Sequence, residues 1–481
     1  MVKRITWAVA WMLVGAVLGL FTAYVLQARA KPPLEPWHRD VLGKDFGVQN
    51  AGESLTEYLS REEALFDKLE QAVSGRGTGD AGVIDRYDPS SPSNPANHPR
   101  DWNRTYEYEQ QEPRGGALLI HGLSDSPYST RASADVFRNS GFHVVGLRVP
   151  GHGTIPGALT VTRWHDWREA VRVAVRHVVE RAGPDKPLVI LGYSNGAALA
   201  VDYTLGVLEG RDDSRPAKLV LLSPALVVKP QARLAGLQRR LAWLPGLERL
   251  AWSSNRPEFD PFKYSSFPVR AGEEIFGLTS QLHPRIERLA RDGKLDEFPP
   301  VLVFQSVVDA TIPPSGIVDR LLSKLRPGSS ELVLFDVNRS APEGLFRGGG
   351  HDAFLNTLTD GPGLPFGLTL VTNVVPESAG VVARRRRSGQ TGWTESLLEL
   401  EWPPMVYSLS HVAIPFPPDD PVYGTRETIG RAGVLNIGGI AARGERGMLA
   451  LPMDLLMRLR YNPFFPYLAE RLTEEVEGVT D

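Results

Sequence analysis

The stretch that decides the fold covers residues 187–203 and reads PLVILGYSNGAALAVDY. Its first part, Leu188–Leu191, is short, apolar and bounded by proline and glycine, which is typical of a buried strand. Its last part, Ala197–Tyr203, begins in small residues and predicts a helix that packs closely on its neighbours. Between them, Ser194 has a glycine two residues before it and another two residues after it. This spacing lets the backbone turn sharply from strand to helix and present the serine hydroxyl at the end of a sheet.

Further short apolar runs follow each other from about residue 105. Helical stretches such as Trp164–Arg181 separate most of them. This alternation predicts an α/β fold with a mostly parallel sheet covered by helices on both faces. Functional sites of such sheets gather at the carboxyl ends of the strands, and Ser194 directly follows one such end. The runs read GGALLIHG, GFHVVGLRVPGHG, KPLVILGYSNG, AKLVLLSPA, PPVLVFQSVVD and SELVLFDVNR.

Composition narrows the possible functions. The chain has 481 residues, enough for one large domain with additions or for two domains. A net charge of -3 gives no reason to expect a nucleic-acid partner. The chain has no cysteine, which excludes disulfides, thiolate metal sites and cysteine nucleophiles. Neither metal-ligand spacing nor a phosphate-binding glycine loop is found, so we expect no metal and no other cofactor.

The N-terminus carries a long uncharged segment, Ile5–Leu26, preceded by two basic residues. As a helix it would be about 33 Å long at ~1.5 Å per residue, which is enough to cross a bilayer. Trp7 and Tyr24 stand near its ends, as interfacial aromatic residues do. We therefore predict an uncleaved single-pass anchor in a bacterial inner membrane, with the large domain that follows it in the periplasm. The alternative is a cleaved signal peptide, because the sequence ARA at 28–30 resembles a cleavage site.

The loop after the strand that ends near residue 120 also indicates chemistry. It contains Leu123, and Asn195 is the residue after the serine. We expect the backbone N–H groups of these two residues to point toward the same position. Together these two groups would hold the negative oxygen of a tetrahedral intermediate. His121 and His152 lie in the neighbouring loops, and we expect them to brace those loops by hydrogen bonds rather than to act as catalysts.

Four motifs in this order resemble those of serine α/β-hydrolases, and most of all the bacterial carboxylesterase and monoacylglycerol lipase group. The resemblance covers about Gly115–Thr311 well and the C-terminal part loosely. It implies an α/β-hydrolase fold and a serine esterase with a cap over its site. Asn195 and Ala197 depart from the residues usual around this serine, but the glycine pattern is kept. The motifs are HGLSDSP, PGHGTIPGAL, GYSNGAALA and QSVVDATIPP.

A serine hydroxyl needs a base to take its proton, and the base needs an acid to orient it. In this fold the chain order is serine, acid, histidine. Asp309 lies just past the strand in VLVFQSVVDATIPP, where the acid belongs. Asp336 is the rival, and we expect it to form a structural hydrogen bond or salt bridge instead.

Two histidines, His351 and His411, follow Asp309 in the chain. Strand counting favours His351, which ends the run RGGGH. His411 follows an apolar strand-like run, and its Ser-His-Val sequence resembles the catalytic histidine loop of the carboxylesterase branch. It requires an insertion of roughly sixty residues with strands of its own. We favour His411 and keep His351 as the alternative; His283 is set aside because it lies in the predicted cap.

These expectations divide the chain into an anchor at 1–30, a linker and helical extension at 31–104, and a hydrolase domain at 105–481. Within the last, 224–299 is the predicted helical cap and about 340–402 the further insertion. The cap would shape an apolar acyl pocket. Four of its residues could line that pocket or face a membrane, although simple packing is expected of each: Trp243, Leu244, Leu247 and Trp252.

The insertion contains the basic run Arg384–Arg387. This run could contact anionic lipid headgroups, but we favour a solvated loop.

The sequence therefore predicts a membrane-anchored serine hydrolase of carboxylic esters that works through an acyl-enzyme. Its substrate would be a lipid-derived acyl ester such as a monoacylglycerol or a lysophospholipid. Two alternatives stay open. One is thioester or amide hydrolysis, or acyl transfer, on the same residues. The other is a non-catalytic anchored binding protein that has kept the fold.

Overall fold

The fold was analysed on a computed structural model. It describes residues 29–480 except for 44, 74–83, 228–235, 237–239, 310, 341–349, 404–405, 426–440, 443–456 and 459, together with scattered residues between 6 and 26.

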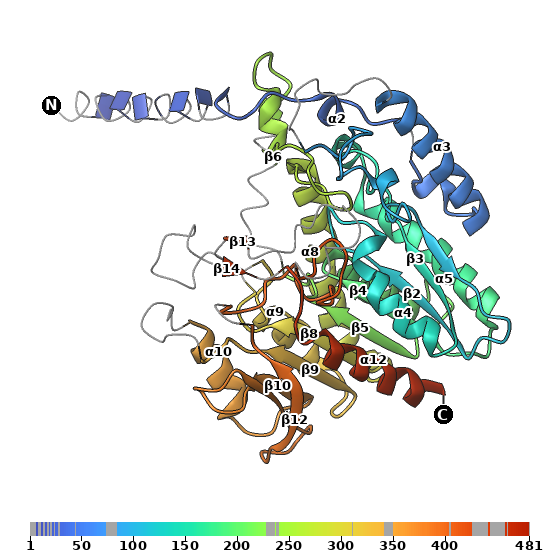
Figure 1. The fold of residues 1–481 in the computed structure, drawn as a ribbon, viewed down its shortest axis with the longest axis vertical. Helices are drawn as coiled ribbons and strands as arrows, with labels where there is room; N and C mark the ends of the chain where they lie inside the picture. The colour runs from blue at the N-terminus through green and yellow to red at the C-terminus, as the bar shows by residue number, and fades with distance from the viewer. Residues whose placement is uncertain are drawn as a thin grey trace.

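One large sheet runs through the described part of the chain, in the order β1-β3-β2-β4-β5-β8-β9-β10-β11-β12 (Figure 1). The strands from β3 to β10 in this order are parallel to one another, and the outer strands β1, β11 and β12 pair antiparallel, with β1 and β12 at the two edges. The mostly parallel sheet predicted from the sequence is therefore confirmed. The strands are β1 (Tyr106–Tyr108), β2 (Gly115–Ile120), β3 (Phe142–Leu147), β4 (Leu188–Tyr193), β5 (Lys218–Leu222), β8 (Val301–Ser306), β9 (Ser330–Phe335), β10 (Gly367–Asn373), β11 (Gly380–Arg386) and β12 (Thr394–Glu401).

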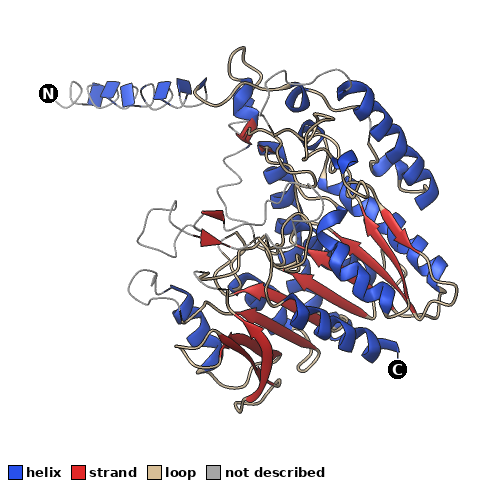
Figure 2. Cartoon of the chain, in the orientation of Figure 1, coloured by secondary structure: helices blue, strands red, loops and turns tan. Residues whose placement is uncertain are grey.

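Helices cover both faces of this sheet (Figure 2). On one face the apolar side chains of the strands pack with those of α5 (Trp164–Ala182), α6 (Asn195–Leu208) and α8 (Val269–Arg291). On the other they pack with α4 (Arg131–Asn139) and α12 (Phe465–Thr480). Because both faces are covered, central strands such as β2 and β4 are buried along their whole length and read as continuous apolar runs.

The described residues of the predicted anchor are helical and project away from the sheet domain (Figure 1). Trp7 and Trp11 are exposed there. Among the residues that the structure describes, none of the helices combines the length and the apolar character that crossing a membrane requires. Much of Ile5–Leu26 lies outside the described residues. The extension that follows contains α2 (Pro36–Arg39) and α3 (Leu55–Val73).

The predicted cap lies between β5 and β8 in the chain. Its described part contains the small pair β6 (Trp252–Ser254) and β7 (Phe267–Pro268), followed by α8. Leu247 and Trp252 are buried in packing contacts, whereas Trp243 is 77% exposed. Part of the predicted amphipathic helix, 231–235 and 237–239, lies outside the described residues.

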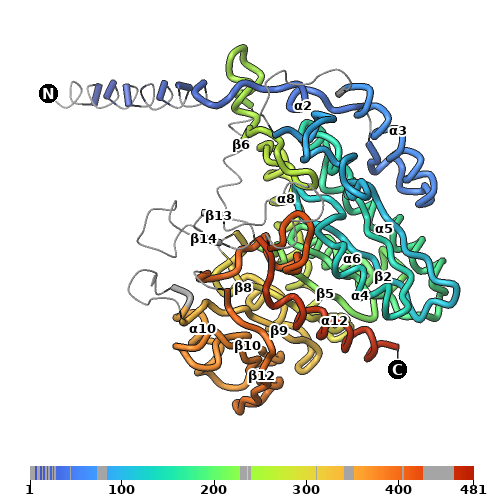
Figure 3. Tube along the Cα trace, viewed as in Figure 1, coloured from blue at the N-terminus to red at the C-terminus, as the bar shows by residue number. Residues whose placement is uncertain are grey.

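The predicted insertion after residue 340 extends the main sheet. It contributes α10 (Gly350–Thr359) and the strands β10 to β12, which continue the sheet beyond β9 (Figure 3). The chain then returns to the end of β9, where the Asn338 N–H donates to Tyr407 O at 2.7 Å. The chain thus begins and ends the insertion at the same place, next to the end of β9.

The prediction that Arg384–Arg387 lies in a solvated loop is wrong, since three of these residues belong to β11. Arg385 pairs with Glu331 at 2.6 Å and Arg384 with Glu395 at 2.9 Å. The two acidic partners come from different strands of the sheet, Glu331 from β9 and Glu395 from β12.

Candidate active site

The turn at Ser194 is a strained connection between β4 and α6. The residue has φ 52° and ψ -110°, a conformation that costs free energy for any residue with a side chain. Neighbouring strands hold it there. Its N–H donates to Leu222 O at 2.9 Å, and its carbonyl accepts from Ala225 N–H at 3.1 Å. The strain therefore persists because the sheet fixes the backbone on both sides.

Both glycines of the turn are required by close backbone contacts. A Cβ at Gly192 would lie 2.5 Å from the backbone of Gly196 and Ala197. A Cβ at Gly196 would lie 2.0 Å from Ile120 O on the neighbouring strand β2. The G-x-S-x-G spacing is thus what allows α6 to begin against the end of β2.

The structure brings Ser194, Asp309 and His411 together. His411 Nε2 lies 3.1 Å from Ser194 Oγ, and His411 Nδ1 lies 2.7 Å from Asp309 Oδ2. Asp309 is buried, and its Oδ1 accepts from Thr311 N–H at 3.0 Å and Ile312 N–H at 2.8 Å. The carboxylate is therefore held in place by its own loop. The Nδ1–H of His411 donates to it, which leaves Nε2 as the acceptor for the serine proton.

His411 reaches this position through the returning end of the insertion. The Asn338 side chain donates to Val406 O at 2.8 Å, next to the backbone bond from Asn338 to Tyr407. The Tyr193 ring lies 5.6 Å from the imidazole, centre to centre. The histidine thus stands where a loop directly following β9 would place it.

The two predicted oxyanion donors lie in the turns that follow β4 and β2. Asn195 is the first residue of α6, so its N–H has no partner within the helix. Leu123 lies in a turn closed by Asp125 N–H donating to Gly122 O at 3.2 Å. Its side chain packs with an apolar cluster that includes Ala225 and Ile312, whose N–H groups bind Ser194 O and Asp309.

Two buried histidines brace the loops around this turn, as expected. His121 accepts from Val149 N–H at 2.9 Å through Nε2, and its Nδ1–H donates to Gly122 O at 2.8 Å. Burial holds the pKa of His121 well below its usual value of 6.5. Burial likewise lowers the pKa of His152 to about 4. Both rings are therefore neutral at ordinary pH.

Sequence reasoning missed a contact between the cap and the oxyanion loop. Lys263 Nζ donates to Asp125 Oδ1 at 2.6 Å, and Tyr264 N–H donates to Ser124 O at 2.8 Å. Ser124 itself has a positive φ of 64°. Lys263 and Asp125 are 138 positions apart, and no local signal connects them.

The rival residues lie elsewhere or in structural roles. Asp336 accepts from Arg339 Nε and from Thr372 Oγ1, both at 2.7 Å, which is the structural bonding expected of it. His351 falls in α10, and its side chain lies outside the described residues. His283 is on α8, 3.8 Å from Glu287.

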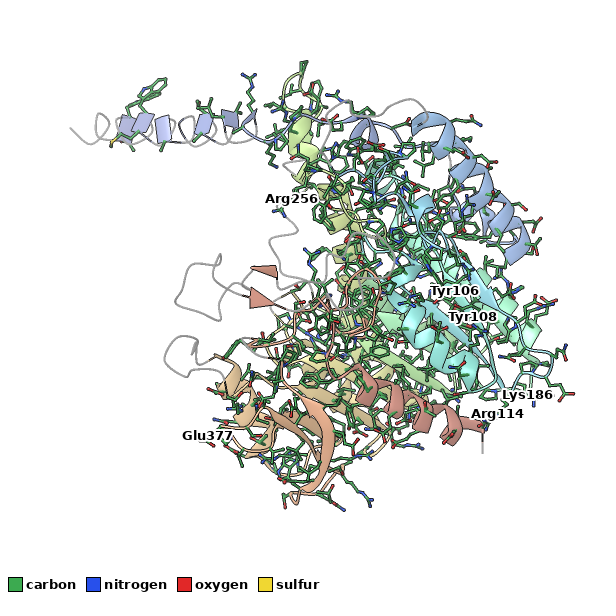
Figure 4. All side chains as sticks on the ribbon, viewed as in Figure 1. Tyr106, Tyr108, Arg114, Lys186, Arg256 and Glu377 are labelled. Atoms are coloured by element: carbon green, nitrogen blue, oxygen red, sulfur yellow. The ribbon has the colours of Figure 1, made fainter. Side chains whose placement is uncertain are left out.

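One group of metal-binding residue types, not expected from the sequence, meets away from this site. Glu107, between the labelled Tyr106 and Tyr108 of β1 in Figure 4, lies 2.8 Å from His143 Nε2 and 2.7 Å from His177 Nε2. Ligands placed about 2.1 Å from a tetrahedral zinc ion would stand farther apart than this. The short contacts instead lower the pKa of Glu107 and join β1 to β3 and α5.

The chain is similar to known hydrolases over the part that carries Ser194 and Asp309. Residues 111–337 match the family model of hydrolases described as serine aminopeptidase, S33. A thermostable monoacylglycerol lipase of Bacillus sp. (strain H-257) is 24% identical over 218 residues, which are 45% of this chain and 79% of the relative. The predicted resemblance, to serine hydrolases of the carboxylesterase and monoacylglycerol lipase group, is confirmed at the level of the family.

Solved structures similar to this chain include two lipases. One is a monoacylglycerol lipase of Paleococcus ferrophilus, with a TM-score of 0.36, 22% identity, and coverage of 48% of this chain and 88% of that one. The other is a soluble variant of the Saccharomyces cerevisiae monoglyceride lipase in complex with a substrate analog. Its TM-score is 0.37 and its identity 16%, with coverage of 48% of this chain and 82% of that one.

Proposed function

We propose that this chain, a serine hydrolase of the α/β-hydrolase fold, cleaves lipid-derived carboxylic esters with Ser194, His411 and Asp309. The observation that carries the proposal is the continuous contact of these three side chains, at 3.1 Å and 2.7 Å, on a serine held in a strained turn. This is the arrangement that a nucleophile, its base and an orienting acid require.

In the proposed reaction, Ser194 Oγ attacks the ester carbonyl carbon while His411 Nε2 takes the hydroxyl proton. The negative oxygen that forms is held by the N–H groups of Leu123 and Asn195. His411 then gives its proton to the leaving alcohol as the carbon–oxygen bond breaks, which leaves an acyl-enzyme. Water, deprotonated by His411, releases the acid. Asp309 orients the imidazole throughout and stabilises its charged form.

Membrane anchoring is the second part of the proposal. The uncharged run Ile5–Leu26 and the exposed Trp7 and Trp11 support a single-pass anchor in a bacterial inner membrane, with the hydrolase domain in the periplasm. A chain held at a bilayer would meet acyl esters there, and relatives named monoacylglycerol lipases fit that substrate class.

The test uses a fluorophosphonate probe on the full-length chain in detergent micelles. We expect labelling of the wild type and its loss in Ser194→Ala. Labelling should also fall in His411→Ala but persist in His351→Ala. If labelling were lost in His351→Ala but kept in His411→Ala, His351 would be the base. An unlabelled, folded wild-type chain would favour the binding-protein alternative.

The substrate is tested by rates on esters of increasing acyl length, with a thioester and an amide of matched length beside them. We expect the highest kcat/KM on medium or long acyl esters. A preference for short esters, or for the thioester or amide, would contradict the proposed substrate class.

A further inference from the structure

The chain segment that leaves the predicted anchor is bound tightly to the cap. We call the described residues 25, 26 and 29–32 the stalk and residues 241–255 the cap loop. Val25 packs against Leu247 and Leu250 of the cap loop. Arg249 Nη1 donates to the carbonyl oxygens of Arg29 at 2.6 Å and Lys31 at 2.5 Å. The stalk is therefore fixed to the cap by apolar packing and by backbone hydrogen bonds.

Bonds on the far side of the stalk complete this docking. Lys31 Nζ donates to Trp252 O at 2.5 Å, and Asn255 Nδ2 donates to Pro32 O at 2.6 Å. Carbonyl acceptors bound by charged donors form strong hydrogen bonds, and several of them together fix a direction as well as a position. The stalk thus cannot turn freely between the anchor and the cap.

This docking sets the depth of the cap loop relative to a bilayer. The anchor runs to Leu26, so Val25 belongs to its last turn and lies at the boundary of the hydrocarbon region when the anchor is inserted. Leu247 and Leu250 contact Val25 directly. The cap loop must then stand within a few side-chain lengths of that boundary.

The cap loop presents an apolar side chain suited to such a surface. Trp243 is 77% exposed, and among the described residues after 30 it is the one aromatic side chain counted as exposed. Its neighbours Leu241 and Leu244 pack toward Leu247 and Leu250. A tryptophan ring with an apolar body and an N–H donor is favoured at the level of the lipid headgroups. Arg256, labelled in Figure 4, projects from the cap on the side from which the N-terminal segment extends.

We propose that the cap loop is a second membrane contact, in which Trp243 inserts into the lipid surface beside the anchor. The proposal rests on the proposed anchoring of Ile5–Leu26. It follows that the cap faces the bilayer. The cap helix α8 contacts Glu248–Ala251 of the cap loop and supplies Ile275 to the apolar cluster that contains Leu123. Through α8, the lipid-facing loop and the predicted oxyanion loop therefore belong to one packed unit.

The chain has no cysteine, so single cysteines can be labelled without background. The experiment uses the full-length chain in nanodiscs of phosphatidylcholine and phosphatidylglycerol, with an environment-sensitive NBD label at Trp243→Cys. The matched control is Leu397→Cys, since Leu397 is also 77% exposed but lies on the edge strand β12. Trp11→Cys reports on the anchor itself.

We expect blue-shifted NBD emission and strong quenching by headgroup-proximal doxyl lipids at position 243, and neither at position 397. Equal behaviour at 243 and 397 with a lipid-exposed label at 11 would overturn this inference alone. A label at position 11 that stays in water would overturn the anchor and with it the inference.

Arg249→Met tests the docking separately. Removing its two bonds to the stalk should reduce quenching at position 243 at least twofold while the label at position 11 is unaffected. Unchanged quenching at 243 would show that the stalk does not set the position of the cap loop.

Discussion

The serine turn and the histidine loop meet where Ser194 Oγ lies 3.1 Å from His411 Nε2, but they are built in different ways. The turn comes from a single stretch of chain, in which β4, Ser194 and α6 follow each other directly. His411 lies 217 residues after the serine and 102 after Asp309. The turn depends on backbone contacts within a few residues and with adjacent strands. The histidine depends on where a long insertion returns to the sheet.

The difference teaches how the fold tolerates additions. The cost of closing a loop grows slowly with its length, so the number of residues between β9 and His411 matters little. What matters is that both ends of the insertion lie at Asn338. The turn has no such freedom, because a Cβ at Gly196 would lie 2.0 Å from Ile120 O. We therefore expect even one added methyl group in the turn to abolish activity or folding. Changes in the histidine loop should lower activity only in part.

The largest effect is expected for Gly196→Ala. The added methyl group collides with the backbone of β2, which cannot move without disturbing the sheet. Fluorophosphonate labelling should fall by about 1000-fold, or the chain should fail to fold, as circular dichroism would show. Gly478→Ala is the control, because a Cβ there meets nothing within 4 Å. A folded, active Gly196→Ala chain would contradict the turn geometry.

Asp309→Asn should come next. An amide at this position can present its NH2 group to His411 Nδ1 and so favour the wrong tautomer, which lowers kcat by about 1000- to 10,000-fold. Asp336→Asn is the matched control. It removes a carboxylate bound to Arg339 and Thr372, so its main effect should be a lower melting temperature, with only a small change in kcat. If Asp336→Asn lowered kcat strongly and Asp309→Asn did not, Asp336 rather than Asp309 would be the acid that orients His411.

Asn338→Ala tests the histidine loop. The variant loses the side-chain bond to Val406 O, which leaves that carbonyl unpaired at a cost of about 1–3 kcal/mol. It also loses the bonds that Asn338 Oδ1 accepts from Ser340 and Asn373. We expect kcat to fall about tenfold with little change in KM, because the nucleophile and the acyl pocket are untouched. Steady-state kinetics and thermal melting measure the two effects. An unchanged kcat would mean that His411 is positioned without Asn338.

The same contrast explains what the sequence could predict. The sheet and the serine turn were predictable because apolar runs and G-x-S-x-G spacing are local patterns that one backbone geometry satisfies. Asp309 followed from its place after a strand. The proximity of His411 rested on resemblance, since no local pattern tells that β10 to β12 join the main sheet. The role of Arg384–Arg387 was missed for the same reason: its partner Glu331 lies on another strand.

Lys263→Met should have a smaller effect on activity. Lys263 binds Asp125 in the turn that carries Leu123, so its loss should let Leu123, the predicted oxyanion donor, move. We expect kcat to fall about three- to tenfold, while Lys324→Met, which breaks an ion pair with Glu287 on α8, leaves kcat nearly unchanged. If both variants lowered kcat equally, the fall would come from a general loss of stability of the cap.

The smallest effect on activity, and a distinct one on stability, is expected from the bracing histidines. Burial lowers the pKa of His152 to about 4 from 6.5, so between these values the unfolded chain binds a proton that the folded chain does not. The stabilisation is complete above pH 6.5 and is lost as pH falls toward 4, by up to about 3 kcal/mol.

Urea unfolding of the wild type, His152→Gln and the exposed His165→Gln at pH 7, 6 and 5 measures this slope. His152→Gln should be less stable than the wild type at pH 7 and should lose less stability on acidification, while His165→Gln follows the wild type. The contrast with His411 is chemical. His411 lies beside a carboxylate and must accept a proton in the proposed reaction, whereas burial holds His152 neutral even though its ring contacts the carbonyls of Val149 and Pro150. Parallel pH profiles for all three chains would show that the loop is braced by packing rather than by its neutral imidazole.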